Sequence, residues 1–304
     1  MRVLFVARCK NGQYAPFVAE QVNALERAGV ECRMFPVSSK RYLRHLRSLW
    51  QEIKNFRPDI IHAHYGLCGL LANLQRGIPI VTTYHGSDIN DPKVRPISRL
   101  SVWLSAYNVF VSRRSIDIIH PWKDFTLIPC GVDMDVFRPM DKTTARREAG
   151  LKADGTYVLF AGAFDNPVKN APLAKAVVSM IPGAELLELK GYTREQVAVL
   201  MSACDALLMT SFSEGSPQVI KEAMACGCPI VSVDVGDVKE RVGEMEGCFV
   251  SNTYKSEELA SLLDKALSFG KRTDGKNAII RDDLTGEAVA FRLKEIYNLV
   301  SSQK

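Results

Sequence analysis

The residues best suited to chemistry lie in one short segment, Ser211-Phe-Ser-Glu-Gly-Ser-Pro-Gln-Val-Ile-Lys-Glu222. The apolar run before it, at 206–210, has the character of a buried strand. Ser216 and Pro217 are typical of the N-cap and the first turn of a helix. Backbone N–H groups at such a helix start lack helical partners and lie at the positive end of the helix dipole. We therefore expect an anion site in this turn, formed by Gly215, Ser216, Pro217 and Gln218.

Two carboxylates flank the expected anion site. Glu214 precedes the turn, and Glu222 lies near the second turn of the expected helix. Ionised carboxylates only accept hydrogen bonds, so beside a bound anion they suit hydroxyl groups. An anion site between two such carboxylates fits a sugar nucleotide, with the diphosphate in the middle, the hexose at one end and the ribose at the other.

The length of 304 residues predicts two domains, because single hydrophobic cores rarely grow that large. A hydrophobic fraction of 47% is that of an ordinary globular protein. Residues 1–140 contain 19 lysines and arginines against 11 aspartates and glutamates, a net charge of +8, whereas residues 141–304 contain 20 against 23, a net charge of −3. The basic half is expected either to face an anionic partner, a phosphorylated acceptor or a membrane surface, or to carry a merely solvated basic surface.

The cysteines and the hydropathy of the sequence indicate the cellular compartment in which the protein is expected. The eight cysteines are scattered without a CxxC pair and fit small buried side chains in a reducing environment. No run of about 18 apolar residues occurs, so no membrane-spanning helix is expected. The apolar start of the chain, residues 1–7, is too short for a signal sequence and is expected to be the first strand. These features predict a cytoplasmic protein.

Short apolar runs alternate with amphipathic stretches along the chain, a pattern typical of parallel sheets with helical crossovers. The alternation is interrupted at Pro129-Cys-Gly-Val-Asp-Met-Asp-Val-Phe-Arg-Pro139 and the polar residues after it. The sequence therefore predicts an α/β protein of two doubly wound, Rossmann-like domains that face a central cleft. We expect the domains at 1–140 and 141–287, with a helix at 288–304 that packs back on the first.

Four motifs resemble those of one large family, the retaining glycosyltransferases of family 4. In the family's order they are Asp59-Ile-Ile-His-Ala-His64, Tyr84-His-Gly-Ser-Asp88, the interdomain segment with Phe137 and Pro139, and Glu214-x7-Glu222. The resemblance covers nearly the whole chain and is strongest to bacterial surface-polysaccharide transferases. It implies the GT-B fold, in which the first domain mainly binds the acceptor and the second binds the nucleotide-sugar donor.

The resemblance also implies roles for single residues. Glu214 would contact hydroxyls of the donor sugar, and Glu222 would hold the ribose. Lys169 would neutralise the diphosphate leaving group, and His85 would lie next to the reacting sugar. Gly12, in the loop after the first strand, would let the backbone approach the donor phosphate.

One position departs from the family pattern. Ala163 lies six residues before Lys169, where the family usually has an arginine. A lost cation opposite a leaving group costs orders of magnitude in rate. Lys190, the helix start or an arginine of the basic half could replace it, and Tyr192 is expected near the nucleotide base.

These residues imply retaining, metal-independent transfer of a hexosyl group from a nucleotide-diphosphate sugar to a lipid-linked or growing cell-surface polysaccharide. No cofactor is expected. Two alternatives stay open, and Ala163 prompts the first of them. One is a nucleotide-sugar-binding protein with weak or no transfer activity, and the other is a GT-B nucleotide-sugar epimerase.

The segment at 40–50 is basic and partly amphipathic, and we expect a helix over 41–56. Leu43, Leu46, Leu49 and Trp50 recur at helical spacing, with arginines alongside. Such a helix either lies on an anionic membrane as a peripheral contact or faces the core with a solvated basic side. No nucleic-acid motif accompanies it, so no nucleic-acid partner is expected.

Two short motifs have a spacing used by metal sites. His62-Ala-His64 lacks an evident third ligand, which favours a structural or acceptor-site role. Asp133-Met-Asp135 lies within the interdomain segment and is interpreted as linker.

Overall fold

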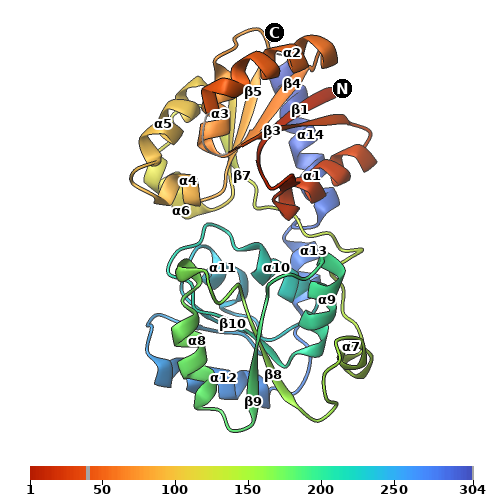
Figure 1. Ribbon diagram of the computed structural model, residues 1–304, viewed down its shortest axis with the longest axis vertical. Coiled ribbons are helices and arrows are strands. Elements are labelled where there is room, and N and C mark those ends of the chain that lie inside the picture. The colour runs from red at the N-terminus through yellow and green to blue at the C-terminus, as the bar shows by residue number, and fades with distance from the viewer. Residues whose placement is uncertain (39–41, 303–304) are drawn as a thin grey trace. The chain divides into compact units, whose positions relative to one another are not determined.

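The computed structural model describes residues 1–38 and 42–302, and the chain divides into two compact units (Figure 1). Unit 1 comprises Met1–Gly131 together with Leu284–Lys304, and unit 2 comprises Val132–Asp283. Each unit contains one sheet whose strands are mostly parallel, with helical crossovers between them. The predicted class, α/β with two doubly wound sheets, is confirmed.

The residues at which the chain passes from one unit to the other differ slightly from the expected domain boundaries. Unit 1 ends at Gly131 rather than at residue 140, and its second segment begins at Leu284. The physical reason is packing: Phe137 is fully buried, and the guanidinium of Arg194 lies 4.6 Å over its ring. The polar-looking segment after Gly131 is therefore anchored in unit 2.

The sheet of unit 1 has the strand order β2-β1-β4-β5-β6-β7, and β3 also pairs with β1. All of these pairings are parallel except that of the short β2 with β1. The strands are β1 (Arg2–Lys10), β2 (Gln13–Tyr14), β3 (Glu31–Val37), β4 (Ile60–His64), β5 (Ile80–Tyr84), β6 (Tyr107–Phe110) and β7 (Phe125–Leu127). The helices are α1 (Pro16–Arg27), the 3-10 turn η1 (Tyr42–His45), α2 (Leu46–Phe56), α3 (Gly66–Asn73), α4 (Ser87–Asn90), α5 (Arg95–Leu104), α6 (Arg113–Ile119) and α14 (Gly286–Ser302).

Alternate residues of β1 separate the two cores of unit 1, because successive side chains of a strand point to opposite faces. Val3 and Phe5 pack in one cluster with residues of α1 and α14. Leu4 and Val6 pack in the other with residues of α2 and α3. Strands β4 and β5 are buried along their whole length, as is usual for parallel strands that helices cover on both faces.

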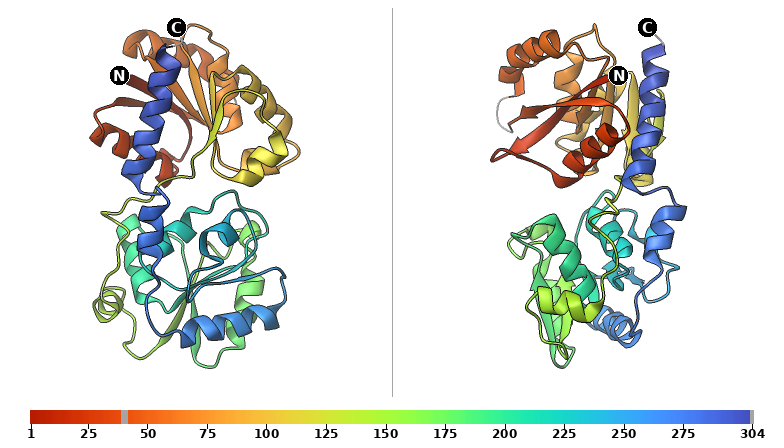
Figure 2. Two further views of the ribbon diagram at one scale, coloured as in Figure 1. Left: turned by 180° about the vertical axis from the view of Figure 1, so that it is seen from behind. Right: turned by 90° about the vertical axis from the view of Figure 1, so that its right-hand side faces the viewer.

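The C-terminal helix α14 belongs to the core of unit 1. Val289, Leu293, Ile296 and Val300 lie in the same cluster as β1, and the helix runs beside α1 (Figure 2). The two places where the chain passes between the units also lie together. A Cβ atom on Gly131 would be only 2.9 Å from Cα of Gly286, so glycine is required there.

The sheet of unit 2 has the order β12-β11-β10-β8-β9 and is entirely parallel. Its strands are β8 (Thr156–Phe160), β9 (Ala184–Glu188), β10 (Ala206–Met209), β11 (Ile230–Val233) and β12 (Phe249–Ser251). Its helices are α7 (Lys142–Glu148), the 3-10 turn η2 (Pro167–Lys169), α8 (Ala171–Ser179), α9 (Arg194–Ala203), α10 (Gln218–Ala225), α11 (Val238–Val242), α12 (Ser256–Ser268) and α13 (Gly275–Arg281).

Two predicted helix starts differ from the structure. The expected helix over 41–56 begins as a 3-10 turn and becomes α-helical at Leu46, and Arg41 lies outside the described residues. The expected N-cap Ser216 is not the cap of α10. Pro217 occupies that position, and the Ser216 hydroxyl is directed to a side chain of the next loop instead.

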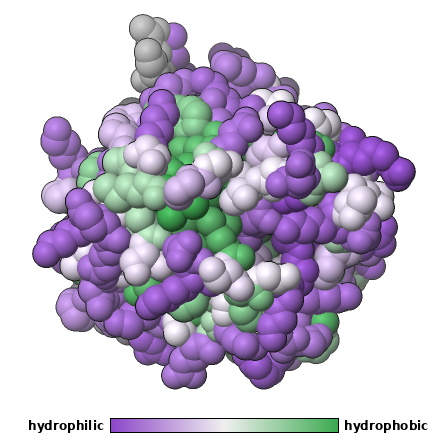
Figure 3. All heavy atoms as spheres, turned by 90° about the horizontal axis from the view of Figure 1, so that it is seen from below, coloured by the Kyte–Doolittle hydropathy of each residue, from purple (hydrophilic) through white to green (hydrophobic). Residues whose placement is uncertain are grey.

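Figure 3 shows hydrophilic side chains over most of the face drawn there, with hydrophobic ones gathered in a band within it. No helix in the described part of the chain is both long enough and apolar enough to cross a bilayer.

Candidate functional site

The loops after β8 and β10 are joined at the carboxyl ends of these neighbouring strands. The backbone N–H of Phe212 donates to the carbonyl of Val168 at 2.9 Å. The Thr210 hydroxyl donates to the carbonyls of Lys169 and Asn170 at 2.9 and 3.0 Å. Parallel strands bring such loops to one edge of the sheet, which is where ligands of doubly wound sheets bind.

Lys169 and Glu214, which the sequence assigned to one site, form an ion pair. Lys169 Nζ lies 2.7 Å from Glu214 Oε1, and their side chains are 21% and 16% exposed. Gly162 makes this possible, because a Cβ atom there would lie 2.7 Å from Cγ of Lys169. The aliphatic part of the lysine therefore crosses the glycine, and its ammonium group reaches the carboxylate while remaining partly open to solvent.

The turn at Gly215 and Ser216 is held from the opposite side by the loop after β11. Gly236 has a φ of +63°, and a Cβ atom there would lie 2.6 Å from the Gly215 carbonyl oxygen. The Ser216 hydroxyl donates to Asp237 Oδ2 at 2.8 Å. Within residues 1–38 and 42–302, the N–H groups of Gly215 and Ser216 find no protein acceptor.

A buried cation supports this turn, and the sequence reading missed it. Lys221 is 1% exposed, and its Nζ donates to the Ser216 hydroxyl at 3.2 Å. Arg241 Nε lies 3.0 Å from Asp237 Oδ2. A charged network of this kind fixes the Ser216 side chain internally, which leaves the backbone of the turn to meet a ligand.

Glu222 is buried, at 3% exposed, and its carboxylate pairs with Arg194. The Arg194 guanidinium also lies over the Phe137 ring, so it is held by charge on one side and by an aromatic face on the other. Arg194 was missed by the sequence reading. The available signal was the capping box Thr193-x-x-Gln196, which starts α9 and places Arg194 in its first turn.

Lys190 and Tyr192 lie in the loop after β9. Lys190 Nζ lies 2.6 Å from Asp165 Oδ2, in the loop after β8, and both side chains are more than half exposed. The ion pair with Asp165 raises the pKa of Lys190. Tyr192 is 47% exposed. The predicted residues of unit 2 thus lie in the loops after β8, β9 and β10 and in helix α10, which follow the carboxyl ends of neighbouring strands.

In unit 1, three histidine rings stack at the carboxyl ends of β4 and β5. The ring centroids of His62 and His64 are 4.8 Å apart, and those of His64 and His85 are 5.1 Å apart. His62 is within hydrogen-bond distance of Tyr297 Oη and Thr83 Oγ1. His64 Nδ1 lies 2.9 Å from His85 Nε2. A structural role for His62 agrees with these contacts.

Burial sets the charge of these histidines. It lowers the pKa of His64 to about 3, and it holds the pKa of His62 well below its usual value, with further lowering by the neighbouring His64 and His85. Asp88 is buried, and its carboxylate accepts the backbone N–H groups of Gly66 and His85 at 2.9 and 3.0 Å. Burial raises its pKa to about 6, although these hydrogen bonds oppose the rise.

The two predicted site residues of unit 1 differ in setting. His85 is half-buried, and both ring nitrogens have neighbours, Nε2 in His64 and Nδ1 in the Cys130 thiol at 3.8 Å. Gly12 lies in the exposed turn between β1 and β2 at a φ of +79°. No atom lies within 4 Å of a Cβ added there, so backbone conformation rather than close packing requires the glycine.

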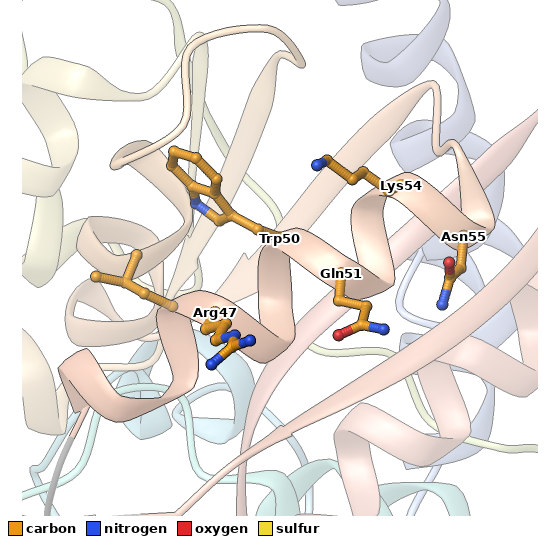
Figure 4. A pocket seen from close by; sticks show the side chains of 6 residues that line it. Arg47, Trp50, Gln51, Lys54 and Asn55 are labelled. Carbon is orange, nitrogen blue, oxygen red and sulfur yellow. The ribbon is translucent and has the colours of Figure 1, made fainter.

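A second surface of unit 1 is formed by α2. A hollow of about 600 Å³ is lined by Leu46, Arg47, Trp50, Gln51, Lys54 and Asn55. Leu49 and Phe56 face the core, whereas Trp50 is 51% exposed. Figure 4 shows Trp50 and Lys54 extending from the same side of the helix. The Trp50 side chain therefore lies on the exposed side of α2 with Arg47 and Lys54, and not on the buried side with Leu49.

The two motifs with metal-site spacing form no cluster of ligands. The described residues contain no group of three or more His, Cys, Asp or Glu side chains that could hold a metal ion. The Asp133 carboxylate accepts the N–H of Asp135 at 3.0 Å, as in a local turn.

Comparison with known proteins matches this arrangement to the GT-B glycosyltransferase structures. Sucrose-phosphate synthase from Thermosynechococcus elongatus superposes with a TM-score of 0.84 over 100% of both chains at 17% identity. HepE from Anabaena, solved in complex with UDP-glucose, has a TM-score of 0.73 at 17% identity, over 98% of this chain and 99% of its own. The fold is therefore GT-B.

Two family profiles match consecutive parts of the chain. The profile for "Glycosyltransferase Family 4" matches residues 3–136, and that for "Glycosyl transferases group 1" matches residues 146–268. The chain belongs to glycosyltransferase family 4. A curated relative, the D-inositol 3-phosphate glycosyltransferase of Mycobacteroides abscessus, is 27% identical over 69% of this chain. This chain spans only 58% of the length of that relative.

Proposed function

We propose that this chain transfers a hexosyl residue from a nucleotide-diphosphate sugar to an acceptor hydroxyl, with retention and without a metal ion. The observation that carries the proposal is the Lys169–Glu214 ion pair beside the free amides of Gly215 and Ser216. The pair combines a cation suited to a diphosphate with a carboxylate suited to sugar hydroxyls.

In the proposed reaction, the bond between the anomeric carbon and the diphosphate oxygen breaks, and the acceptor oxygen bonds to the same face of that carbon. The departing phosphate takes the proton of the acceptor hydroxyl, so no side chain need act as base. Lys169 and the helix start at Gly215–Gln218 stabilise the negative charge that develops on the leaving group. Glu222, held by Arg194, binds the ribose.

The acceptor is proposed to be a lipid-linked or growing cell-surface polysaccharide. The basic charge of residues 1–140 supports an acidic acceptor or an anionic surface nearby. We further propose a peripheral contact with the cytoplasmic face of an anionic membrane through α2. Arg47 and Lys54 would meet lipid headgroups, and Trp50 suits the interface because its ring is apolar and its N–H is polar.

Donor binding is tested first, by a thermal-shift screen with UDP-, GDP- and ADP-sugars. UDP-glucose heads the set because HepE was solved with it. If the backbone contacts the base, residue types do not reveal which base is bound. The screen with different nucleotides therefore identifies it. Ligand far above its dissociation constant should raise the melting temperature by several degrees.

Turnover is then measured for Lys169→Met and Glu214→Gln with the donor so identified. Loss of the cation opposite the leaving group should lower kcat about 100-fold or more. The matched control is Lys271→Met, which breaks an exposed ion pair with Glu246 in the same unit and should leave kcat within about twofold. Equal losses in Lys169→Met and the control would contradict the assigned role.

The same assay separates the alternatives. Tight donor binding without product, whatever the acceptor, would identify a binding protein. Isomerised donor formed without any acceptor would identify an epimerase. Activity abolished by EDTA and restored by a divalent ion would refute metal independence.

A further inference from the structure

The carboxyl end of β1 projects beyond its neighbour in the sheet of unit 1. Its pairing with β4 ends at Val6↔Ala63, whereas its pairing with β2 continues at Cys9↔Tyr14 and Lys10↔Gln13. This hairpin and the start of α3 border a cavity of about 670 Å³, a size typical of ligand pockets. Its lining comprises Arg8, Cys9, Lys10, Asn11, Gln13, Tyr14, Ala15, Val18 and Tyr65.

The lining has two cations and no carboxylate. None of the ion pairs formed among the described residues involves Arg8 or Lys10. Burial raises the pKa of Tyr65, Asp88 and Cys130 raise it further, and the charge of Arg8 opposes the rise, which shows that Arg8 lies near this ring. Asn11 and Gln13 add amide donors at the same rim. An anion is the ligand that this set of donors recognises.

The backbone of the cavity wall is held in an uncommon conformation. Tyr65 has a φ of +73°, which is rare for an aromatic residue and is a strained conformation. Its N–H donates to the Thr83 carbonyl at 2.8 Å, and its ring lies 4.6 Å from that of His85. The strain directs an aromatic side chain into the wall of the cavity, beside the histidine expected to face the reacting sugar.

We propose that this cavity binds the phosphoryl group of a phosphorylated acceptor, with Arg8 and Lys10 as its ligands and Tyr14 and Tyr65 beside the attached group. The inference rests on the proposed transferase function and specifies its acceptor as one that carries a phosphate. A lipid-linked phosphate and a soluble sugar phosphate share this chemistry, and the test distinguishes them.

Cys9 provides a local probe, because it lines the cavity and is half-exposed. Its alkylation by iodoacetamide is followed by mass spectrometry, with the half-exposed Cys32 of the same unit as internal control. We expect inorganic phosphate to slow alkylation of Cys9 at least fivefold at constant ionic strength, and to leave Cys32 unchanged. Equal rates with phosphate and with chloride would overturn the proposal.

Variants assign the effect to the cations. Arg8→Gln should abolish the protection, and Arg8→Lys should keep part of it, because lysine retains the charge but not the paired donors of the guanidinium. The matched control is Arg76→Gln, an exposed position of the same unit before β5, which should keep full protection. Protection that survives Arg8→Gln and Lys10→Gln together would refute the assignment.

The remaining probes identify the source of the phosphate. Protection by a hexose phosphate but not by the free hexose supports a soluble acceptor, and protection by a polyprenyl phosphate in detergent alone supports a lipid-linked one. Protection by a nucleoside diphosphate but not by phosphate would assign the cations to the donor and overturn the proposal. Donor-induced thermal shifts in the same samples report the transferase function separately, so the two can fail independently.

Discussion

The histidines of β4 show how burial decides the state of a residue. His62 and His64 are both fully buried on one face of the strand, and their neighbours are rings and hydroxyls rather than carboxylates. The neutral imidazole is therefore the form that the fold accommodates. Protonating either ring would place an uncompensated charge in the core.

This predicts destabilisation in acid. The pKa of His64 is about 3 in the folded state against about 6.5 in the unfolded chain, so below about pH 6.5 only the unfolded state binds the proton. The free energy of unfolding should then fall by about 1.4 kcal/mol per pH unit for this histidine as the pH drops from about 6.5 towards 3. His64→Gln should reduce the slope by that amount. Urea unfolding between pH 7 and 5, followed by tryptophan fluorescence, measures it, because all three tryptophans lie in unit 1.

The comparison with wild type matters, because the effect of Asp88 on stability in acid is opposite to that of His64. Its raised pKa of about 6 means that the folded state binds a proton more readily than the unfolded chain, which partly offsets the histidines between about pH 6 and 4. His120→Gln, which removes an exposed histidine of the same unit, is the control expected to keep the wild-type slope. The same slope in His64→Gln as in wild type would show that His64 is already charged in the fold.

The turn at Glu214 could be picked out from residue types, whereas Lys169 entered the site only through the family resemblance. The ion pair between the two side chains was not expected from either. Arg194 and Asp237 could not be assigned, because their partners Glu222 and Ser216 are distant in sequence and no local pattern encodes such a contact.

Among the elements, α2 most clearly departs from its sequence pattern. The helical spacing of Trp50 and the leucines left open whether they face the core or a membrane, and the structure separates them, with Leu49 buried and Trp50 exposed beside Arg47 and Lys54. The reason is geometric: Leu49 and Phe56 already fill the face towards the sheet, and Trp50 lies about 100° further round the helix. Strand β2, which forms a hairpin with β1, was also not expected, because two residues are too few to show an alternating strand pattern.

The exposed face of α2 predicts binding to anionic vesicles. Removing one cation, in Lys54→Gln or Arg47→Gln, should weaken binding to phosphatidylglycerol vesicles about fivefold, because each basic residue near the surface contributes about 1 kcal/mol. Trp50→Ala should weaken it further and independently of salt. A flotation assay with vesicles of pure phosphatidylcholine as reference measures both effects.

Trp122→Ala is the matched control, since Trp122 is 74% exposed in the same unit but lies outside α2. It should leave vesicle binding unchanged. Equal binding to neutral and anionic vesicles, or equal losses in the two tryptophan variants, would rule out α2 as the contact.

At the scale of the whole molecule, unit 1 is built from both ends of the described chain. Helix α14 contributes to its core, and Lys294 Nζ donates to the Ala28 carbonyl at 2.6 Å. The long amphipathic pattern at the end of the sequence made this helix predictable. We also expected this helix to pack back on the first domain.

The packing of α14 predicts a sharp contrast within one helix. Leu293 is 1% exposed and Leu299 is 48% exposed. Leu293→Ala should lower the free energy of unfolding of unit 1 by about 2–5 kcal/mol, because it leaves a cavity in the core. Leu299→Ala should change it by about 0.5 kcal/mol or less. Urea titration followed by tryptophan fluorescence compares them, and similar losses in both variants would show that α14 is not docked.

The junction at which Gly131 touches Gly286 has a consequence for biosynthesis. Everything between these two glycines, including all of unit 2, must leave the ribosome before α14 can cover the face of β1 and α1. Unit 2 is a continuous stretch and can fold as it emerges, whereas the earlier-made part of unit 1 waits with an uncovered apolar surface. Of the two units, the one whose translation starts earlier is thus the one completed later, and its apolar surface stays uncovered during that interval.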